Sequence, residues 1–167
     1  EWQNRGAEPE EERAEQQVGP TAEIKHITPP RNDNNLHHHL KPEDMLVKTY
    51  CAAVNGLEVT TVTIEVSLNR GVQYHLTGLG DEAVRESRDR IAAALQYSGF
   101  KFPVADITIN MAPADLRKEG SSFDLPLAIG ILGANSNIIE DHLKEYMMVG
   151  ELSLDGTLQP IRGALPI

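Results

Sequence analysis

The stretch VTTVTIEVSLNRGVQYHLTGL, residues 59–79, decides the fold class. Its first half alternates polar and apolar residues and is rich in Val, Thr and Ile, which is typical of a half-buried β-strand over 59–68. Residues 72–79 follow as a second strand after the turn residues Asn69, Arg70 and Gly71. The pattern therefore predicts an antiparallel hairpin of these two strands.

A strand and a helix are expected on either side of this hairpin. VKTYCAAV, residues 47–54, predicts a strand before it. A helix is predicted over 82–98, because apolar residues recur there at helical spacing between the N-cap residue Asp81 and the stop residue Gly99. The bases of this helix have acids nearby in the sequence, so we expect an exposed, ion-paired face formed by Arg85, Arg88, Arg90, Glu82, Glu86 and Asp89.

Another strand and another helix follow, joined by a loop of about ten residues, MAPADLRKEGSS. ADITINM, residues 105–111, predicts the strand, and the apolar run LPLAIGILGA, residues 125–134, predicts a buried helix. Pro126 fits only a first turn, which puts the helix start between Ser121 and Asp124. These two residues also have capping-box spacing.

The last part of the chain predicts a polar helical stretch at IIEDHLKEY, residues 138–146, and two short strands in MMVGELSLDGTLQPI that turn at Asp155-Gly156. Runs of strands mixed with two main helices favour a two-layer α/β sandwich of the α+β kind over a doubly wound parallel sheet. We therefore expect a mixed sheet covered by two helices.

Length and charge limit the function classes. The chain has 167 residues, enough for one ordinary domain, and a net charge of −10, which does not suit nonspecific binding of a nucleic-acid backbone. Cys51 is the only cysteine, so no disulfide forms within the chain. The first residues contain no apolar signal segment and no run approaches membrane-spanning length, so we expect a cytoplasmic protein that does not contact a membrane.

Residues 1–44 differ in composition from the rest, with ten acids, five bases and few large apolar residues. We expect a disordered acidic tail, or sequence upstream of a start at Met45, and one domain over 45–167. His37, His38 and His39 are adjacent within this tail. Because adjacent histidines in a flexible segment rarely share one ion, we expect no metal site.

Ser121 and Ser122 pose the main chemical question. A serine at a helix N-terminus lies beside free backbone amides, which suits a nucleophile but also suits a simple helix cap. A nucleophile needs a base within hydrogen-bond reach, and Lys118 and His75 are the candidates that the residues themselves supply, neither with an identifiable third group to orient it. The phosphate-loop, HExxH and CxxC motifs are absent from the sequence.

Four ordered blocks between 45 and 167 resemble the N-terminal domain of the YifB/ComM family, the magnesium-chelatase-like AAA+ ATPases. The blocks are MLVKTYCAAVNGLEVTTVTIEV, GLGDEAVRESRDRIAAALQYSGFKFP, ITINMAPADLRKEGSSFDLPLAIGIL and GELSLDGTLQPIRGALPI. Two positions depart from the family pattern, since Cys51 stands where Gly is usual and Gly80 where Pro is usual. Both fall in turns or strand ends, so the implied fold is unaffected.

The family domain is in turn similar to the proteolytic domain of Lon, on the ribosomal protein S5 domain 2-like fold. KEGSSFD matches Lon's nucleophile motif and places Ser122 at the nucleophile position, while an ungapped match of the last block places Leu165 where Lon has its catalytic lysine. Phe123 and Asp124 also replace the small residues that let substrate approach in Lon. The resemblance therefore implies a degenerate site without catalysis, in which Ser122 caps a helix.

The resemblance implies an accessory domain of a ring-forming ATPase involved in DNA branch migration during natural transformation. The expected partners are the AAA+ module of the same polypeptide and further copies of the protein, with DNA contacted indirectly. This chain itself should hold no cofactor, because ATP and magnesium belong to the AAA+ module that follows in the family. Two alternatives remain open. One is a Lon-type serine protease, and the other is a single-stranded DNA-binding module that uses Arg117, Lys118 and Arg162.

Overall fold

The computed structural model describes residues 46–55, 58–139 and 141–161. Its first four strands form one mixed sheet in the order β1-β2-β4-β3, in which β1–β2 and β2–β4 are antiparallel and β3–β4 is parallel. The four strands are β1 (Leu46–Asn55), β2 (Glu58–Asn69), β3 (Tyr74–Thr77) and β4 (Asp106–Ala112).

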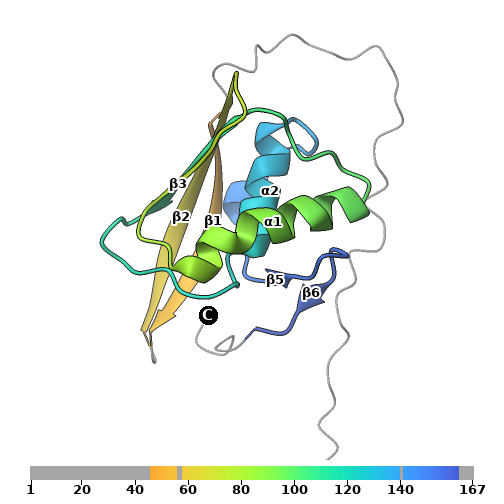
Figure 1. The fold of residues 1–167 in the computed structure, drawn as a ribbon. Helices are drawn as coiled ribbons and strands as arrows, with labels where there is room; N and C mark the ends of the chain where they lie inside the picture. The colour runs from red at the N-terminus through yellow and green to blue at the C-terminus, as the bar shows by residue number, and fades with distance from the viewer. Residues whose placement is uncertain (1–45, 56–57, 140, 162–167) are drawn as a thin grey trace, which may run out of the picture.

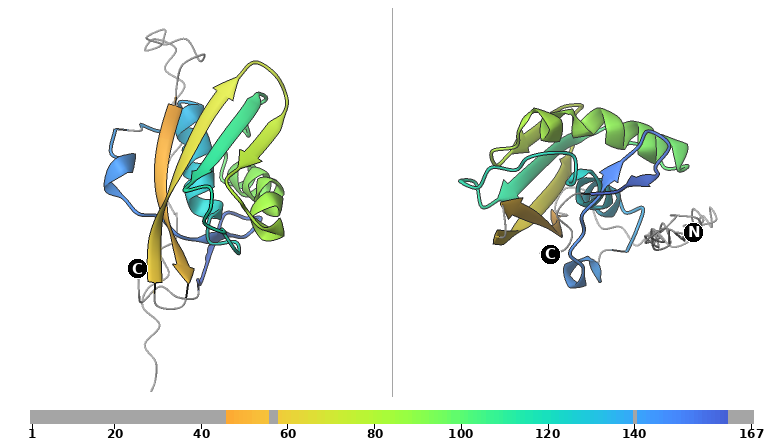
Figure 2. Two further views of the ribbon diagram at one scale, coloured as in Figure 1. Left: turned by 90° about the vertical axis from the view of Figure 1, so that its left-hand side faces the viewer. Right: turned by 90° about the horizontal axis from the view of Figure 1, so that it is seen from below.

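Both α-helices of the described residues, α1 (Glu82–Tyr97) and α2 (Asp124–Ala134), lie on one face of the sheet (Figure 1). A short hairpin of β5 (Glu151–Leu152) and β6 (Leu158–Gln159) follows, and β5 contacts both helices. No α-helix of the described residues lies on the other face of the sheet, as the left panel of Figure 2 shows. The predicted two-layer α+β sandwich with a mixed sheet and two main helices is thus confirmed.

The core lies between the sheet and the two helices. Strands β2 and β4 supply one side of it, with alternate residues that are at most 1% exposed, namely Val62, Ile64, Val66, Ile107, Ile109 and Met111. Helix α2 is apolar on nearly all sides, and its buried glycines let its backbone approach β1 and β2, since a Cβ on Gly130 would lie 2.8 Å from Val66 Cγ2. Burial of apolar surface at this contact is the main stabilising contribution.

One predicted pairing is wrong. Strand β3 follows β2 in sequence but does not pair with it, because β4 lies between them and pairs with both. Asp106, the first residue of β4, holds the segment just before β3 in place. Its carboxylate accepts a hydrogen bond from the Gln73 backbone N–H at 2.7 Å. Burial explains the order, because the continuously apolar inner side of β4 needs a central position, whereas Tyr74 and Leu76 of β3 are only half-buried and suit an edge.

The prediction of a polar helical stretch at 138–146 is also mostly wrong. Within its described residues the structure has only a 3₁₀ turn, η2 (Leu143–Glu145). The chain then extends along the edge of the sheet, where the Met148 N–H donates to the Tyr50 carbonyl at 2.8 Å. Pairing to β1 thus takes precedence over the local helical preference of a short segment.

The predicted helix starts and the predicted final turn agree better with the structure. Asp81 is the N-cap of α1 and accepts from the Val84 N–H at 2.9 Å, and Pro126 lies in the first turn of α2. The β5–β6 hairpin turns at Gly156, which has a φ of +82°. Among the described residues, no helix is long and apolar enough to cross a membrane.

The open face of the sheet carries a row of polar contacts across all four strands. Lys48 of β1 pairs with Glu65 of β2 at 2.9 Å, and Glu65 accepts from Asn110 of β4 at 3.0 Å. Thr77 of β3 donates to the Asn110 side-chain oxygen at 3.1 Å. These residues are direct neighbours in the strand register, so the row runs straight across the sheet.

Gly78 offers a test of the contact between β4 and the turn after β3. Its φ is +101°, and an added Cβ would lie 2.0 Å from the Met111 carbonyl oxygen, whereas Gly99 has a φ of +85° with nothing within 4 Å. Gly99→Ala should cost about 1–2 kcal/mol of unfolding free energy for its left-handed backbone. Gly78→Ala should cost about 1–3 kcal/mol more, because the backbone must move. Urea unfolding of both variants measures the difference, and equal costs would contradict the packing described.

Candidate functional site

The candidate site is a pocket of about 390 Å³ that contains Ser122. Strand β1 forms one wall near its end, and the loop before α2 forms the other. The β1 wall is apolar, whereas the loop wall mixes apolar and charged side chains. The lining residues are Ala52, Ala53, Val54, Asp115, Leu116, Arg117, Glu119, Ser122, Phe123, Val149 and Ile161.

Ser122 does not cap helix α2, so that part of the sequence interpretation is wrong. The helix begins at Asp124, its N-cap residue is Phe123, and no side chain caps it. Ser122 therefore precedes the cap position by one residue, and its backbone carbonyl instead accepts from the Gly150 N–H at 2.8 Å. No side chain of the described residues makes a hydrogen bond to its hydroxyl in the structure.

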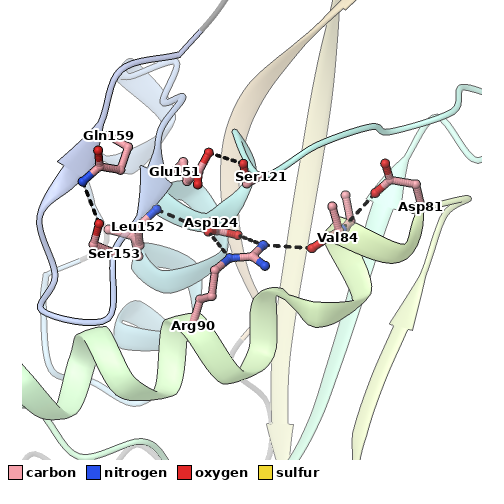
Figure 3. A network of polar contacts seen from close by, with 10 residues as sticks. Asp81, Val84, Arg90, Ser121, Asp124, Glu151, Leu152, Ser153 and Gln159 are labelled. Atoms are coloured by element: carbon pink, nitrogen blue, oxygen red, sulfur yellow. Dashed lines mark hydrogen bonds and ion pairs between the residues drawn. The ribbon is translucent and has the colours of Figure 1, made fainter.

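Ser121 and Asp124 do not form the predicted capping box either. Ser121 donates from its hydroxyl to the carboxylate of Glu151 on β5 (Figure 3). The Asp124 carboxylate faces away from Ser121 toward helix α1, where Arg90 binds it, and it also accepts from the Leu152 N–H at 3.3 Å. Stronger partners on other elements thus replace the local cap.

Arg90 and Asp124 form a two-point ion pair between the helices. The Arg90 Nε donates to Asp124 Oδ2 at 2.8 Å and its Nη2 donates to Asp124 Oδ1 at 2.9 Å, while Nη2 also donates to the Ala83 carbonyl. Asp124 is fully buried and the Arg90 side chain is 23% exposed. Hydrogen bonding to Asp124 raises the pKa of Arg90 above its ordinary value.

Arg90 was expected on a solvent-exposed, ion-paired face, so its placement is a correction. Only Arg88 pairs with an acid of that face, Asp89, at 3.7 Å, and the Arg88 guanidinium also lies 5.7 Å from the centre of the Tyr74 ring. The sequence did contain one indication of this pairing, because Asp124 is a lone acid directly before a buried apolar run. A charge in that position needs an opposite charge.

Asp81 fixes the loop to the start of α1. Besides capping the helix, its carboxylate accepts from the Gly120 N–H at 3.0 Å. The backbones on either side also pair, because the Asp81 N–H donates to the Lys118 carbonyl and the Lys118 N–H donates to the Leu79 carbonyl. The loop is therefore held by α1 at one end and, through Ser121 and Asp124, by α1 and β5 at the other.

Lys118, expected on a nucleic-acid or partner surface, is instead fully buried. Its ammonium donates to the Pro113 carbonyl, and loss of hydration lowers its pKa, although the nearby Asp115 acts in the opposite direction. Arg117 is on the surface, but it pairs with Glu119 at 2.9 Å. Arg162 lies outside the described residues, so the three predicted contact residues do not form one described basic patch.

The candidate bases for Ser122 are not brought to it. His75 lies on β3, at the opposite edge of the sheet from β1, and its ring contacts Gln73. Leu165, at the position matched to the catalytic lysine, lies outside the described residues. Within the described part of the chain, no group of three or more His, Cys, Asp or Glu residues could share a metal ion, and His37 to His39 lie outside it.

Comparison with known proteins places this geometry in a family. The family model described as subunit ChlI of Mg-chelatase matches residues 64–167. The competence protein ComM of Haemophilus influenzae is 45% identical over 122 residues, which cover 72% of this chain and 24% of that protein. The uncharacterized protein YifB of Escherichia coli is 42% identical over 114 residues, which cover 68% of this chain and 22% of YifB.

The chain thus spans about a quarter of the length of the curated relatives that it matches, among which an uncharacterized Mycobacterium tuberculosis protein is 41% identical over 122 residues. The matched family region begins within β2 and includes α1, the loop before α2 and the β5–β6 hairpin. All described elements of the candidate site except strand β1 therefore fall within it. On these matches, the chain belongs to the family described as subunit ChlI of Mg-chelatase, with ComM and YifB among its relatives.

Proposed function

We propose that residues 45–167 form an accessory domain without hydrolase chemistry of its own, within a magnesium-chelatase-like AAA+ protein of the YifB/ComM kind. The observation that carries the proposal is the setting of Ser122. It lies in a pocket, but no His, Lys or carboxylate of the described residues hydrogen-bonds to its hydroxyl. A serine without a base within reach is a weak nucleophile.

The polar residues around Ser122 support the same proposal, because they are used to hold the loop in place. Glu151 accepts from Ser121, Asp124 binds Arg90, and Asp81 binds the backbone of Gly120. Lys118 is buried against the Pro113 carbonyl. Each of these four polar residues thus has a structural partner, and the loop serves as a rigid wall of the pocket.

The role of the whole protein follows as part of the proposal. A relative named a competence protein suggests a place in DNA uptake, and the sequence resemblance suggests branch migration by an AAA+ ring. In that arrangement the ATPase module binds ATP and magnesium, copies of the protein assemble through that module, and this domain contacts DNA only indirectly. The net charge of −5 over residues 45–167 favours an indirect role.

The first test addresses catalysis at Ser122. The chain should neither hydrolyse unstructured peptide substrates nor become labelled at Ser122 by a serine-directed fluorophosphonate, because no base activates the hydroxyl. Mass spectrometry of the labelled chain and of a Ser122→Ala control measures this. Robust labelling of Ser122, absent from the control, would favour the serine-protease alternative and overturn the proposal.

The second test addresses direct DNA binding. Labelled single-stranded and branched DNA titrated into the chain at about 150 mM salt should show at most weak binding that depends strongly on salt. The reason is that few lysine and arginine side chains are available to neutralise phosphates. Arg117→Ala should change it little, because Arg117 is already paired with Glu119. Sub-micromolar, structure-selective binding under these conditions would support the DNA-binding alternative instead.

The third test addresses the rigid loop. Arg90→Met leaves the fully buried Asp124 without its cation and should cost about 3–5 kcal/mol of unfolding free energy. The control Glu119→Gln removes the charge of the acid from an exposed arginine–carboxylate pair, Arg117–Glu119, and should cost at most about 1 kcal/mol. Denaturant unfolding compares them. The double variant Arg90→Met/Asp124→Leu should recover part of the loss. If Arg90→Met costs as little as Glu119→Gln, the Arg90–Asp124 pair does not hold the loop as described.

A further inference from the structure

Ile161 lines the pocket that contains Ser122, and it is the last residue that the structure describes. The chain reaches this position from the β5–β6 hairpin, which is itself fixed beside the pocket. The Gly150 N–H donates to the Ser122 carbonyl at 2.8 Å, and Glu151 accepts from the Ser121 hydroxyl. The residues after Ile161 therefore start at the wall of the pocket.

The walls of the pocket are mostly apolar and join the core. Val54 is 37% exposed although it is apolar. Ala53, Leu116 and Val149 also line the pocket and are only partly buried, while packing against the core. An apolar side chain placed in the pocket would extend the core and remove these walls from water, which is favourable. The charged lining residues are all exposed and form the rim, namely Asp115, Arg117 and Glu119.

The residues that follow Ile161 have the composition that such walls favour. Residues 162–167 read RGALPI, and the last four of them are apolar. Leu165 comes four residues after Ile161, and four residues span at most about 14 Å, which is enough to enter a pocket of about 390 Å³. Because the segment is attached at the wall, its effective concentration at the pocket is on the order of millimolar, which favours it over a separate ligand.

We propose that residues 162–167 fold back into the pocket and that Leu165 fills its apolar part beside Ser122. The segment thereby closes the pocket from within the same chain. A separate peptide or small molecule then reaches Ser122 only when the segment is withdrawn. The inference goes beyond the proposed function and does not depend on it, because a pocket can be closed whether or not its serine is activated.

Thiol reactivity at position 122 tests whether the pocket is closed. A Ser122→Cys variant is treated with iodoacetamide, and mass spectrometry measures the rate of alkylation. Cys51 does not interfere, because it is fully buried and burial raises the pKa of its thiol to about 12. Removal of residues 162–167 should raise the rate at position 122 at least about tenfold, since the thiol reacts only in the open fraction. Equal rates in the two chains would overturn the inference.

A substitution in the chain of full length guards against partial unfolding of the shortened chain. Leu165→Asp should also raise the rate of alkylation at position 122, because a carboxylate is costly to bury in an apolar pocket. Ile139→Asp is the matched control, because Ile139 is 81% exposed and its replacement should leave the rate unchanged. Alkylation of Cys51 reports unfolding in each variant. A Leu165→Asp chain that reacts no faster than the Ile139→Asp chain would contradict the proposed closure.

A cross-link locates the segment. Ser122→Cys combined with Leu165→Cys should form a disulfide within one chain under mild oxidation, because two cysteines are bridged only when their Cα atoms lie within about 7 Å. Ser122→Cys combined with Val104→Cys should not, since Val104 precedes β4 at the end of the sheet away from Ala52. A disulfide between two chains would place the segment in a neighbouring copy, and that result or the absence of any cross-link would overturn the inference.

Labelling of the shortened chain separates this inference from the proposed function. With Ser122 in place, the chain that ends at Ile161 should still resist a serine-directed fluorophosphonate, because opening the pocket supplies no base. Labelling of the shortened chain alone would retain the closing segment but overturn the non-catalytic role. Equal alkylation rates without any labelling would overturn the closing segment and leave the non-catalytic role intact.

Discussion

The buried ion pair between Arg90 and Asp124 is the contact on which the other parts of the site depend. It joins α1 to the first turn of α2, and the same carboxylate reaches β5 through the Leu152 N–H (Figure 3). Desolvating two charges is costly, so such a pair adds little to net stability compared with an apolar contact. Its contribution is to fix orientation, because a two-point contact allows only one arrangement of the helices.

This constraint explains why a serine in a pocket need not be a nucleophile. Asp124 is directed toward α1 and Glu151 accepts from Ser121, so the acid that follows Ser122 in the chain and the acid that contacts Ser121 are already engaged. Helix α2 itself must pack closely on the sheet, which fixes where the loop before it ends. The shape of the pocket is therefore a consequence of core packing.

Much of the fold could be predicted from the sequence, because local signals agreed with it. The cap at Asp81, the position of Pro126 and the turn at Gly156 each depend on a few adjacent residues. The pairing of β3 could not be predicted, since it depends on β4, more than 25 residues later. The burial of Lys118 and the partner of Asp124 also depend on contacts that form only when the loop folds against α1.

The polar row across the open face of the sheet has a consequence for how the sheet assembles. Lys48, Glu65, Asn110 and Thr77 contribute one residue from each strand, and a slip of one residue would turn each toward the core. The row therefore penalises every incorrect alignment. It cannot be completed until the chain as far as Asn110 has been synthesised, so the local β1–β2 hairpin can form first and the row closes later, through a non-local contact.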